Sequence, residues 1–173
     1  MDSSLDLGLF IVRLALGPML VFHGYNKVFG AGGLAGTTRW FEALGLKPAW
    51  LHARIAPVNE IGAGILLTVG LITPLAAAAY IGLMTVAGRT DHRNKGYFMF
   101  KNGWEYVLLV AMVALGLAAT GPGKWSLDHV IGLDWNGWVW ALVAAVLGVG
   151  FALVLLAVSY KPATKESEPA VAA

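Results

Sequence analysis

Cysteine is absent from this chain of 173 residues, and charged residues are scarce. The first absence excludes disulfides, catalytic thiols and cysteine-ligated zinc or iron–sulfur sites. Only 13% of the residues are charged, against about 25% in soluble proteins, whereas 58% are hydrophobic and the mean hydropathy is +0.69. Because so few charges cannot cover the surface of a soluble fold, we expect the chain to be embedded in lipid.

A positively charged leader is also missing. Residues 1–6 contain Asp2 and Asp6 but no Lys or Arg. A secretory signal peptide needs a basic start and a cleavage site with small residues. The first apolar segment is therefore expected to stay in the protein as a helix.

Long apolar segments predict five transmembrane helices. They lie at about residues 7–29, 51–71, 73–87, 102–119 and 137–160. A helix needs about 20 apolar residues to cross a hydrocarbon core of about 30 Å, so the three middle segments are short and one of them could be re-entrant. Thr37 or Thr38 starts an amphipathic segment with Trp40 and Phe41, which predicts a helix lying at the membrane surface.

The basic residues predict the orientation in the membrane. Of the 12 Lys and Arg residues, all but Arg13 and Lys124 flank the first loop, the third loop or the C-terminal tail. Cytoplasmic loops are enriched in Lys and Arg, so the N-terminus is expected outside and the C-terminus in the cytoplasm. Arg13 is expected to form a structural ion pair with Asp128 of the last loop.

Four ionisable side chains lie within the predicted helices near their cytoplasmic ends: His23, Lys27, Glu60 and Glu105. Placing such a group in the membrane costs about 2.5–3.5 kcal/mol on insertion scales, so each needs a partner or a function. His23 and Lys27 are four residues apart and share one helix face. The predicted topology brings all four groups into one polar pocket in the inner leaflet.

This pocket suggests quinone chemistry. A histidine and a carboxylate at headgroup depth can exchange protons with a quinone ring whose tail lies in lipid. The candidate catalytic residues are His23, Glu60 and Glu105. The candidate substrate-binding residues are Lys27, which could stabilise an anionic reduced form, Asn59 and Trp104.

Structural roles remain open for the same residues. Glu105 follows Asn102 by three residues, the spacing of a capping box at a helix start. Glu60 could form a structural ion pair with Lys27 or Arg54. Lys27 could also extend its amine to the interface without any part in chemistry.

Metal or haem binding is not expected. A histidine such as His23 could simply bond to a backbone carbonyl. Bis-histidine haem ligation would need a second histidine at the same depth, but His52 lies at a helix entrance, His92 in a loop and His129 on the opposite side. No metalloprotease, nucleotide-binding or dinucleotide-binding motif occurs, and nothing predicts nucleic-acid binding.

Five short segments resemble the DoxX family of small bacterial membrane proteins: residues 23–30, 59–64, 70–74, 102–106 and 121–128. The resemblance covers about residues 7–132. The resemblance implies a four-helix membrane core in the bacterial plasma membrane. It also implies similarity to the membrane subunit of a thiosulfate:quinone oxidoreductase and to redox and detoxification complexes. The family motif positions in this sequence are His23, Lys27, Glu60, Glu105 and Asp128.

The predicted fold class is all-α: a polytopic membrane helix bundle with a DoxX-like four-helix core and an extra C-terminal transmembrane helix. Residues 1–135 form the predicted core, including the interfacial helix of the first loop. Residues 136–160 form the additional helix. Residues 161–173 form a polar cytoplasmic tail that is expected to be disordered.

The predicted function is that of a membrane subunit of a quinone-linked oxidoreductase or redox-defence complex. Quinone is the expected cofactor, and a redox partner protein is expected to supply electrons, because the chain has no evident redox centre. Two alternatives stay open: an accessory or assembly subunit of a larger respiratory complex, and a small-molecule or proton pathway. The expected partners are membrane lipid and other membrane subunits or a second copy of the chain.

Overall fold

All the secondary-structure elements of the described residues, 3–162 of the computed structural model, are helical. The long helices are α1 (Ser3–Phe29), α3 (Ala49–Val69), α4 (Thr73–Thr90), α5 (Glu105–Thr120) and α7 (Trp138–Ser159). The short ones are α2 (Gly33–Ala43), the 3-10 turn η1 (Met99–Lys101) and α6 (Leu127–Val130). The predicted all-α fold class is confirmed, and each predicted apolar segment corresponds to one long helix.

The surface of the bundle is apolar enough for a membrane protein. By length and composition, α1 and α7 could each cross a membrane, and α5 is a shorter apolar helix. Large apolar side chains cover the outside, among them Phe22, Phe151 and Val158, which are 70%, 71% and 74% exposed. Because exposing apolar area to water costs about 25 cal/mol per Å², this surface fits a lipid environment.

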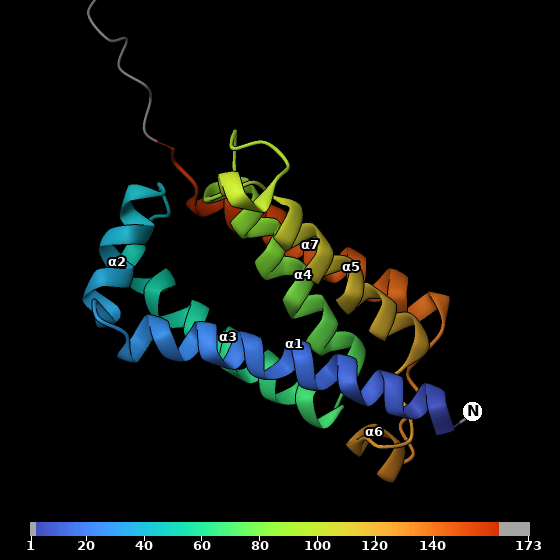
Figure 1. The fold of residues 1–173 in the computed structure, drawn as a ribbon. Coiled ribbons are helices and arrows are strands. Elements are labelled where there is room, and N and C mark those ends of the chain that lie inside the picture. Colours follow the sequence, from blue (N-terminus) through green and yellow to red (C-terminus); the bar gives the residue numbers. More distant parts are fainter. Residues whose placement is uncertain (1–2, 163–173) are drawn as a thin grey trace, which may run out of the picture.

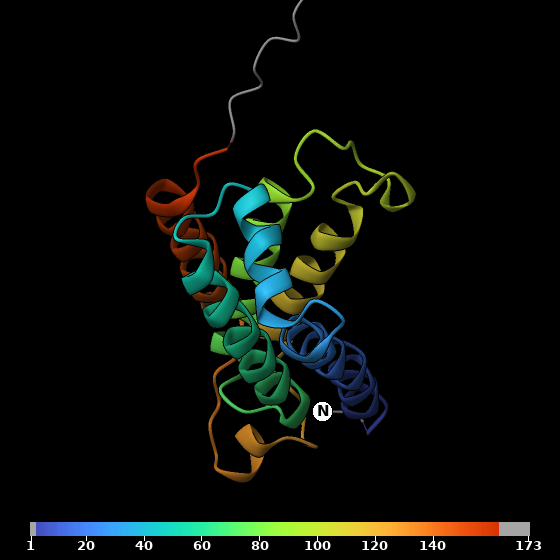
Figure 2. The ribbon, with the colours of Figure 1, turned by 90° about the vertical axis from the view of Figure 1, so that its left-hand side faces the viewer.

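The long helices form two groups. In the first group α1 packs along α3, and α2 packs against both. In the second group α4 packs against both α5 and α7. The two groups meet where α6 lies and spread apart toward α2 (Figures 1 and 2). We call these two regions the α6 end and the α2 end.

Glycines allow α1 and α3 to approach closely. A Cβ atom on Gly17 would lie 2.8 Å from the carbonyl oxygen of Gly64, and one on Gly64 would lie 2.6 Å from that of Gly17. Further along the same seam, a Cβ on Gly24 would lie 2.9 Å from the carbonyl oxygen of Pro57. Small residues at such positions are typical of packed membrane helices.

The helix α7 joins the bundle through α4 and α5. It approaches α4 closely at Gly148, where a Cβ would lie 2.6 Å from the carbonyl oxygen of Ala78. The predicted division of the chain at residue 135 stays a prediction. Most of the predicted tail, residues 163–173, lies outside the described residues.

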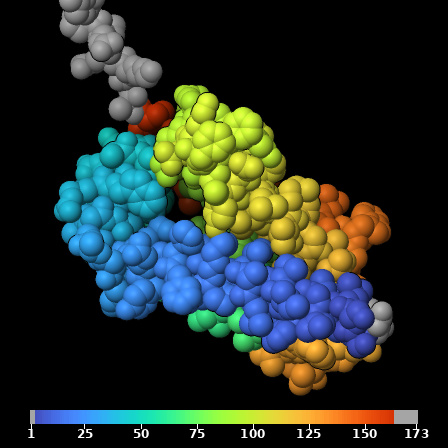
Figure 3. Space-filling view, in the orientation of Figure 1, coloured from blue at the N-terminus to red at the C-terminus, as the bar shows by residue number. Residues whose placement is uncertain are grey.

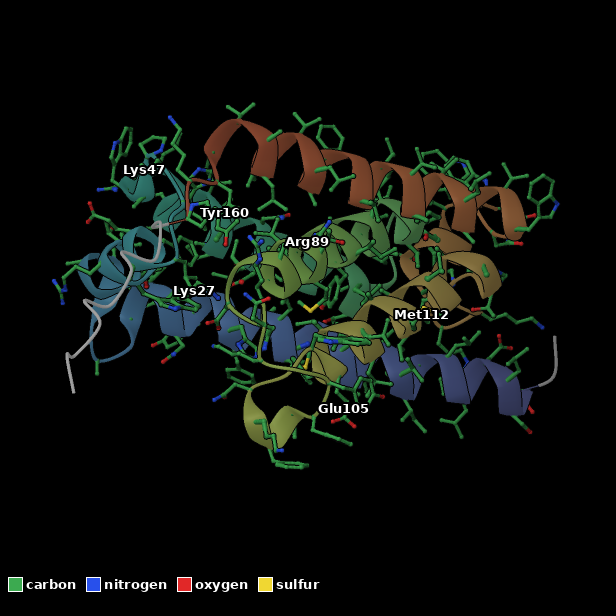
Figure 4. All side chains as sticks on the ribbon, turned by 90° about the horizontal axis from the view of Figure 1, so that it is seen from above. Lys27, Lys47, Arg89, Glu105, Met112 and Tyr160 are labelled. Atoms are coloured by element: carbon green, nitrogen blue, oxygen red, sulfur yellow. The ribbon has the colours of Figure 1, made fainter. Side chains whose placement is uncertain are left out.

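The C-terminal end of α7 is attached to the loop between α2 and α3. The backbone N–H of Lys47 donates to the carbonyl of Ser159 at 2.8 Å, and that of Lys161 donates to the carbonyl of Gly45 at 2.7 Å. Lys47 and Tyr160 accordingly appear on neighbouring segments in Figure 4. This attachment links the two helix groups at the α2 end.

The carboxylate of Asp128 attaches α6 to the start of α4 at the α6 end. Its carboxylate accepts hydrogen bonds from the N–H of Ile72 at 2.7 Å and from the N–H and hydroxyl of Thr73 at 3.0 and 2.7 Å. The side chain is buried. These bonds satisfy backbone donors at the start of α4, which have no partner within the helix.

Arg13 is bound to backbone carbonyls at the same end. Its guanidinium donates from Nη1 to the carbonyl of Thr68 at 2.7 Å and from Nη2 to the carbonyl of Trp125. Within residues 3–162 it forms no direct ion pair with Asp128, so the predicted pair requires correction. The two groups attract each other only at longer range, because the Asp128 carboxylate is occupied by the start of α4.

Candidate functional site

A cavity of about 730 Å³ lies between the two helix groups at the α2 end. Figure 3 shows the surface hollowed between α1, α2 and the yellow-green segment before α5. Most of the lining side chains are apolar, including Leu20, Phe41, Leu83, Leu147 and Leu155. Small-molecule sites are typically cavities of about 300–1,000 Å³ with apolar walls and a few polar groups, so this cavity has the size of a ligand site.

An ion pair joins α1 to α3 in the cavity wall. Lys27 Nζ lies 2.7 and 2.8 Å from the two carboxylate oxygens of Glu60, and the side chains are only 13% and 9% exposed. Gly24, one turn before Lys27, brings the helices together here: a Cβ at this glycine would lie 3.1 Å from the Cβ of Glu60. Of the open alternatives for Glu60, the structure selects Lys27 as its ion-pair partner.

The helix α2 packs over this ion pair. The hydroxyl of Thr37 donates to the backbone carbonyl of Lys27 at 2.8 Å. Lys27 Nζ also lies 5.8 Å from the ring centroid of Trp40, within the range of a cation–π interaction. Trp40 lines the cavity as well, so an aromatic ring stands beside the charged groups.

His23 and Asn59 line the same cavity and are more exposed than the ion pair. His23 lies one turn before Lys27 on α1, and Asn59 directly precedes Glu60 on α3. The His23 ring has no hydrogen-bond partner among the described side chains and backbone groups. Four of the predicted site residues therefore share one cavity, and His23 keeps its ring nitrogens available.

Glu105 and Trp104 do not line the cavity, so the predicted convergence of four ionisable groups holds for three of them. The carboxylate of Glu105 instead accepts a hydrogen bond from the N–H of Met99 at 2.9 Å. The ring of Trp104 packs edge-on against Tyr97, with the centroids 4.9 Å apart. Figure 4 shows Glu105 on the loop side of α5, apart from Lys27.

The physical reason lies in where α5 begins. The apolar segment predicted a helix start at Asn102, but α5 starts at Glu105. The carboxylate is therefore at the junction with the preceding turn and binds a backbone donor there. This matches the expectation that Glu105 satisfies backbone groups, although its donor precedes the helix.

Two histidines outside the predicted site also line the cavity: His52 at the start of α3 and His92 after α4. His52 is 9% exposed, and its buried Nε2 has no partner among the described residues. His92 Nδ1 lies 2.7 Å from the carbonyl oxygen of Asn102. The sequence carried one indication: His52 precedes Glu60 by eight residues, about two helical turns, and thus shares its face of α3.

The cavity borders the outside of the bundle between α3 and α7. These two helices line it but are not packed along each other. Ile55 of α3 and Phe151 of α7 belong to the lining and are 49% and 71% exposed. In a membrane, this apolar seam would face lipid. Asp91 and His92 instead line the cavity near the loop that follows α4.

The arrangement suits an amphipathic ligand. An ammonium, a carboxylate and an imidazole gather on one wall, and apolar side chains form most of the rest. The ion pair can exchange one of its hydrogen bonds for a ligand oxygen, and a histidine can move a proton near neutral pH.

Comparison with protein families gives a match to the family model described as DoxX over residues 8–93. This range runs from α1 through α4 and ends in the loop that follows. It contains the cavity residues His23, Lys27 and Glu60.

Curated relatives match over most of their length. The chain is 25% identical over 135 residues to "Inner membrane protein YqjF" of Escherichia coli, covering 75% of this chain and 96% of the relative. It is 29% identical over 131 residues to "Putative oxidoreductase CatD" of Bacillus subtilis, covering 76% and 92%. It is 32% identical over 128 residues to "Inner membrane protein YphA" of Escherichia coli, covering 70% and 88%. No solved structure matches the chain.

Proposed function

Because the chain belongs to the DoxX family of membrane proteins, we propose that it is the membrane subunit of a quinone-linked oxidoreductase or redox-defence complex. One observation carries the proposal. The Lys27–Glu60 ion pair and His23 line a cavity of about 730 Å³ that is otherwise mostly apolar and borders the side of the bundle. A relative whose printed name includes "oxidoreductase" supports the same assignment.

The cavity fits a quinone in two respects. The ring would lie against Lys27, Glu60 and His23, where ammonium and imidazole can donate to its oxygens. The isoprenoid tail would leave through the seam between α3 and α7, beside Ile55 and Phe151. When bound, a quinone supplies two-electron redox chemistry coupled to proton transfer.

In this proposal the chain's own residues bind the ring and move protons. Lys27 holds negative charge on the ligand, while Glu60 keeps the ammonium in place. His23, which has no fixed partner among the described groups, exchanges protons with the ligand. Electrons come from a partner redox protein. The α2 end faces the cytoplasm, because most of the basic residues flank it.

The test is quinone binding by the purified protein in lipid nanodiscs. Decylubiquinone should quench the fluorescence of Trp40, which lines the cavity, and the variant Trp40→Phe should lose most of that quenching. The double variant Lys27→Met/Glu60→Leu should weaken binding about ten- to a hundredfold, the cost of one lost charge-assisted hydrogen bond to the ligand. Lys124→Met is the matched control: the Lys124 side chain is exposed at the α6 end, and this variant should bind quinone as the wild type does.

Quinone binding that is equal in the wild type and in Lys27→Met/Glu60→Leu would refute the proposal. If the wild type does bind and its redox partner is isolated with it, Glu60→Gln and His23→Ala should each abolish quinone reduction by the complex.

A second candidate function is an accessory or assembly subunit of a larger membrane complex. The outer face of α7 favours it: Leu142, Val146 and Leu153, none of which lines the cavity, are 55%, 61% and 47% exposed. This function predicts a stoichiometric membrane partner in mild detergent and full tolerance of His23→Ala. A chain that purifies alone or only with itself would count against it.

A small-molecule or proton pathway has weaker support. A passage would have to cross the α6 end, where Arg13 and Asp128 are buried and bound to backbone groups. Flux through the protein in liposomes, above that of empty liposomes, would favour this function.

A further inference from the structure

His92 lines the same cavity as the ion pair, but from the loop after α4. It is only partly buried, beside Asp91, which is also part of the lining and pairs with Lys95 at 3.2 Å. The lining therefore includes a titratable ring that lies on a loop and not on α1 or α3, the helices that carry Lys27, Glu60 and His23.

The hydrogen bond of His92 determines which ring nitrogen carries the proton. Nδ1 lies 2.7 Å from the carbonyl oxygen of Asn102, and a carbonyl oxygen can only accept. Nδ1 must therefore be the protonated nitrogen, so in the neutral ring Nε2 is an acceptor, and it has no hydrogen-bond partner among residues 3–162. A histidine held in this way by a backbone carbonyl is oriented for proton transfer.

A tight turn holds the carbonyl of Asn102 in place. Asn102 has a left-handed backbone with φ of 60°, and its N–H donates to the carbonyl of Met99 at 2.8 Å. The N–H of Met99 in turn donates to the carboxylate of Glu105 at 2.9 Å. Glu105 thus fixes the turn that fixes His92, although it does not line the cavity itself.

We propose that His92 Nε2 exchanges protons between a quinol bound in the cavity and the water at the α2 end, and that Glu105 is its positioning residue. This inference rests on the proposed function. During oxidation, Nε2 accepts the proton of a ligand hydroxyl as its O–H bond breaks and then releases that proton to water. The electrons pass to the redox partner's acceptor. In the reverse direction His92 delivers the proton.

The first test reads the ring directly and needs no ligand. Nitrogen NMR of histidine-labelled protein in nanodiscs should show neutral His92 with the proton on Nδ1, the signal being assigned through its loss in His92→Gln. Glu105→Ala should convert it to a mixture of the two tautomers. Glu105→Gln keeps an acceptor for Met99 and should restore the wild-type spectrum. A proton on Nε2 in the wild type would overturn the proposal.

The second test measures proton release. Decylubiquinol bound in nanodiscs is oxidised by two equivalents of ferricyanide, each taking one electron, and a pH dye records the two protons. His92→Gln should slow the release about a hundredfold, the usual contribution of a proton-transferring side chain. The affinity of His92→Gln for quinone should stay within about twofold of the wild-type affinity, as measured by quenching of Trp40 fluorescence. His129→Gln, exposed at the α6 end, should match the wild type.

The outcomes separate this inference from the proposed function. Normal Trp40 quenching with unchanged proton release in His92→Gln would overturn the role of His92 alone. Absence of quenching in the wild type would overturn the proposed function and this role with it.

Discussion

At the α6 end of the bundle, the buried charged side chains Arg13 and Asp128 bind backbone groups, whereas in the cavity at the α2 end Lys27 and Glu60 bind each other. Asp128 accepts hydrogen bonds from the start of α4, and Arg13 donates to two carbonyls. Lys27 and Glu60 bind each other in the wall of the cavity, and the His23 ring has no partner among the described groups. Both ends bury ionisable groups in a bundle that is otherwise apolar.

The difference indicates which charges serve the fold and which can serve a ligand. A charge that satisfies several backbone groups cannot turn toward a ligand without leaving them unpaired, which is costly in a buried site. Two side chains that bind only each other can exchange that bond for a ligand. We therefore assign structural roles to the α6 end and ligand binding to the α2 end.

Removing Asp128 should have the largest effect on stability. In Asp128→Ala the two N–H groups at the start of α4 lose their acceptor, and we expect the free energy of unfolding to fall by about 4–5 kcal/mol. Titration with SDS in mixed micelles measures this change. His129→Ala, the exposed neighbour on α6, should change stability by less than about 0.5 kcal/mol. An Asp128→Ala variant as stable as the wild type would show that the Asp128 carboxylate does not stabilise the α6 end.

Breaking the Lys27–Glu60 ion pair should lower the free energy of unfolding by less than Asp128→Ala does. A second substitution should restore most of that loss. Glu60→Ala leaves Lys27 without a partner, and we expect a loss of about 2–3 kcal/mol, since the lysine can move toward the interface. The double variant Lys27→Met/Glu60→Leu should regain most of that stability but not quinone binding. If the double variant were as unstable as Glu60→Ala, the ion pair would serve the fold, as the charges at the α6 end do, and the contrast between the two ends would be lost.

The glycine seam between α1 and α3 tests the packing that connects the ends. A Cβ at Gly17 would lie 2.9 Å from the backbone nitrogen of Thr68, so Gly17→Ala should force the helices apart and cost about 1–3 kcal/mol. Gly62 also lies on α3, but a Cβ there meets nothing within 4 Å. Gly62→Ala is therefore the control. Equal SDS midpoints for the two variants would contradict the described seam.

His23 should contribute least to stability. It is exposed in the cavity and has no bonded partner among the described residues, so His23→Ala should change the free energy of unfolding by less than about 0.5 kcal/mol. The affinity of the His23→Ala variant for decylubiquinone should nevertheless fall about tenfold, which corresponds to the loss of one hydrogen bond to the ligand. A large loss of stability would instead indicate a structural histidine.

Local sequence patterns were sufficient to predict the long helices and α2. The apolar runs identified all the long helices, and the amphipathic residues around Trp40 identified α2, which begins earlier than expected, at Gly33. The short helix α6 was missed, because its four residues lie in a segment rich in Gly and Asp. The ends of helices depend on contacts with distant segments, such as Asp128 with Thr73, which local patterns do not contain.

The site was predicted only in part for a related reason. Helix direction and depth correctly brought His23, Lys27 and Glu60 together. The depth of a residue in the membrane does not reveal that Glu105 binds the N–H of Met99. It also does not reveal that the two helix groups spread apart at the α2 end (Figures 1 and 2). His92, which follows α4 in the sequence, lines the resulting cavity, and no local pattern predicted this.

Photolabelling tests the central claim most directly, namely that the polar cavity at the α2 end binds quinone. An azidoquinone in nanodiscs, activated by light, should label peptides from α1, α2 and α3 that line the cavity, and excess decylubiquinone should suppress the label. The label should disappear in Lys27→Met/Glu60→Leu. Labelling confined to the outer face of α7, or unchanged in that variant, would contradict the account.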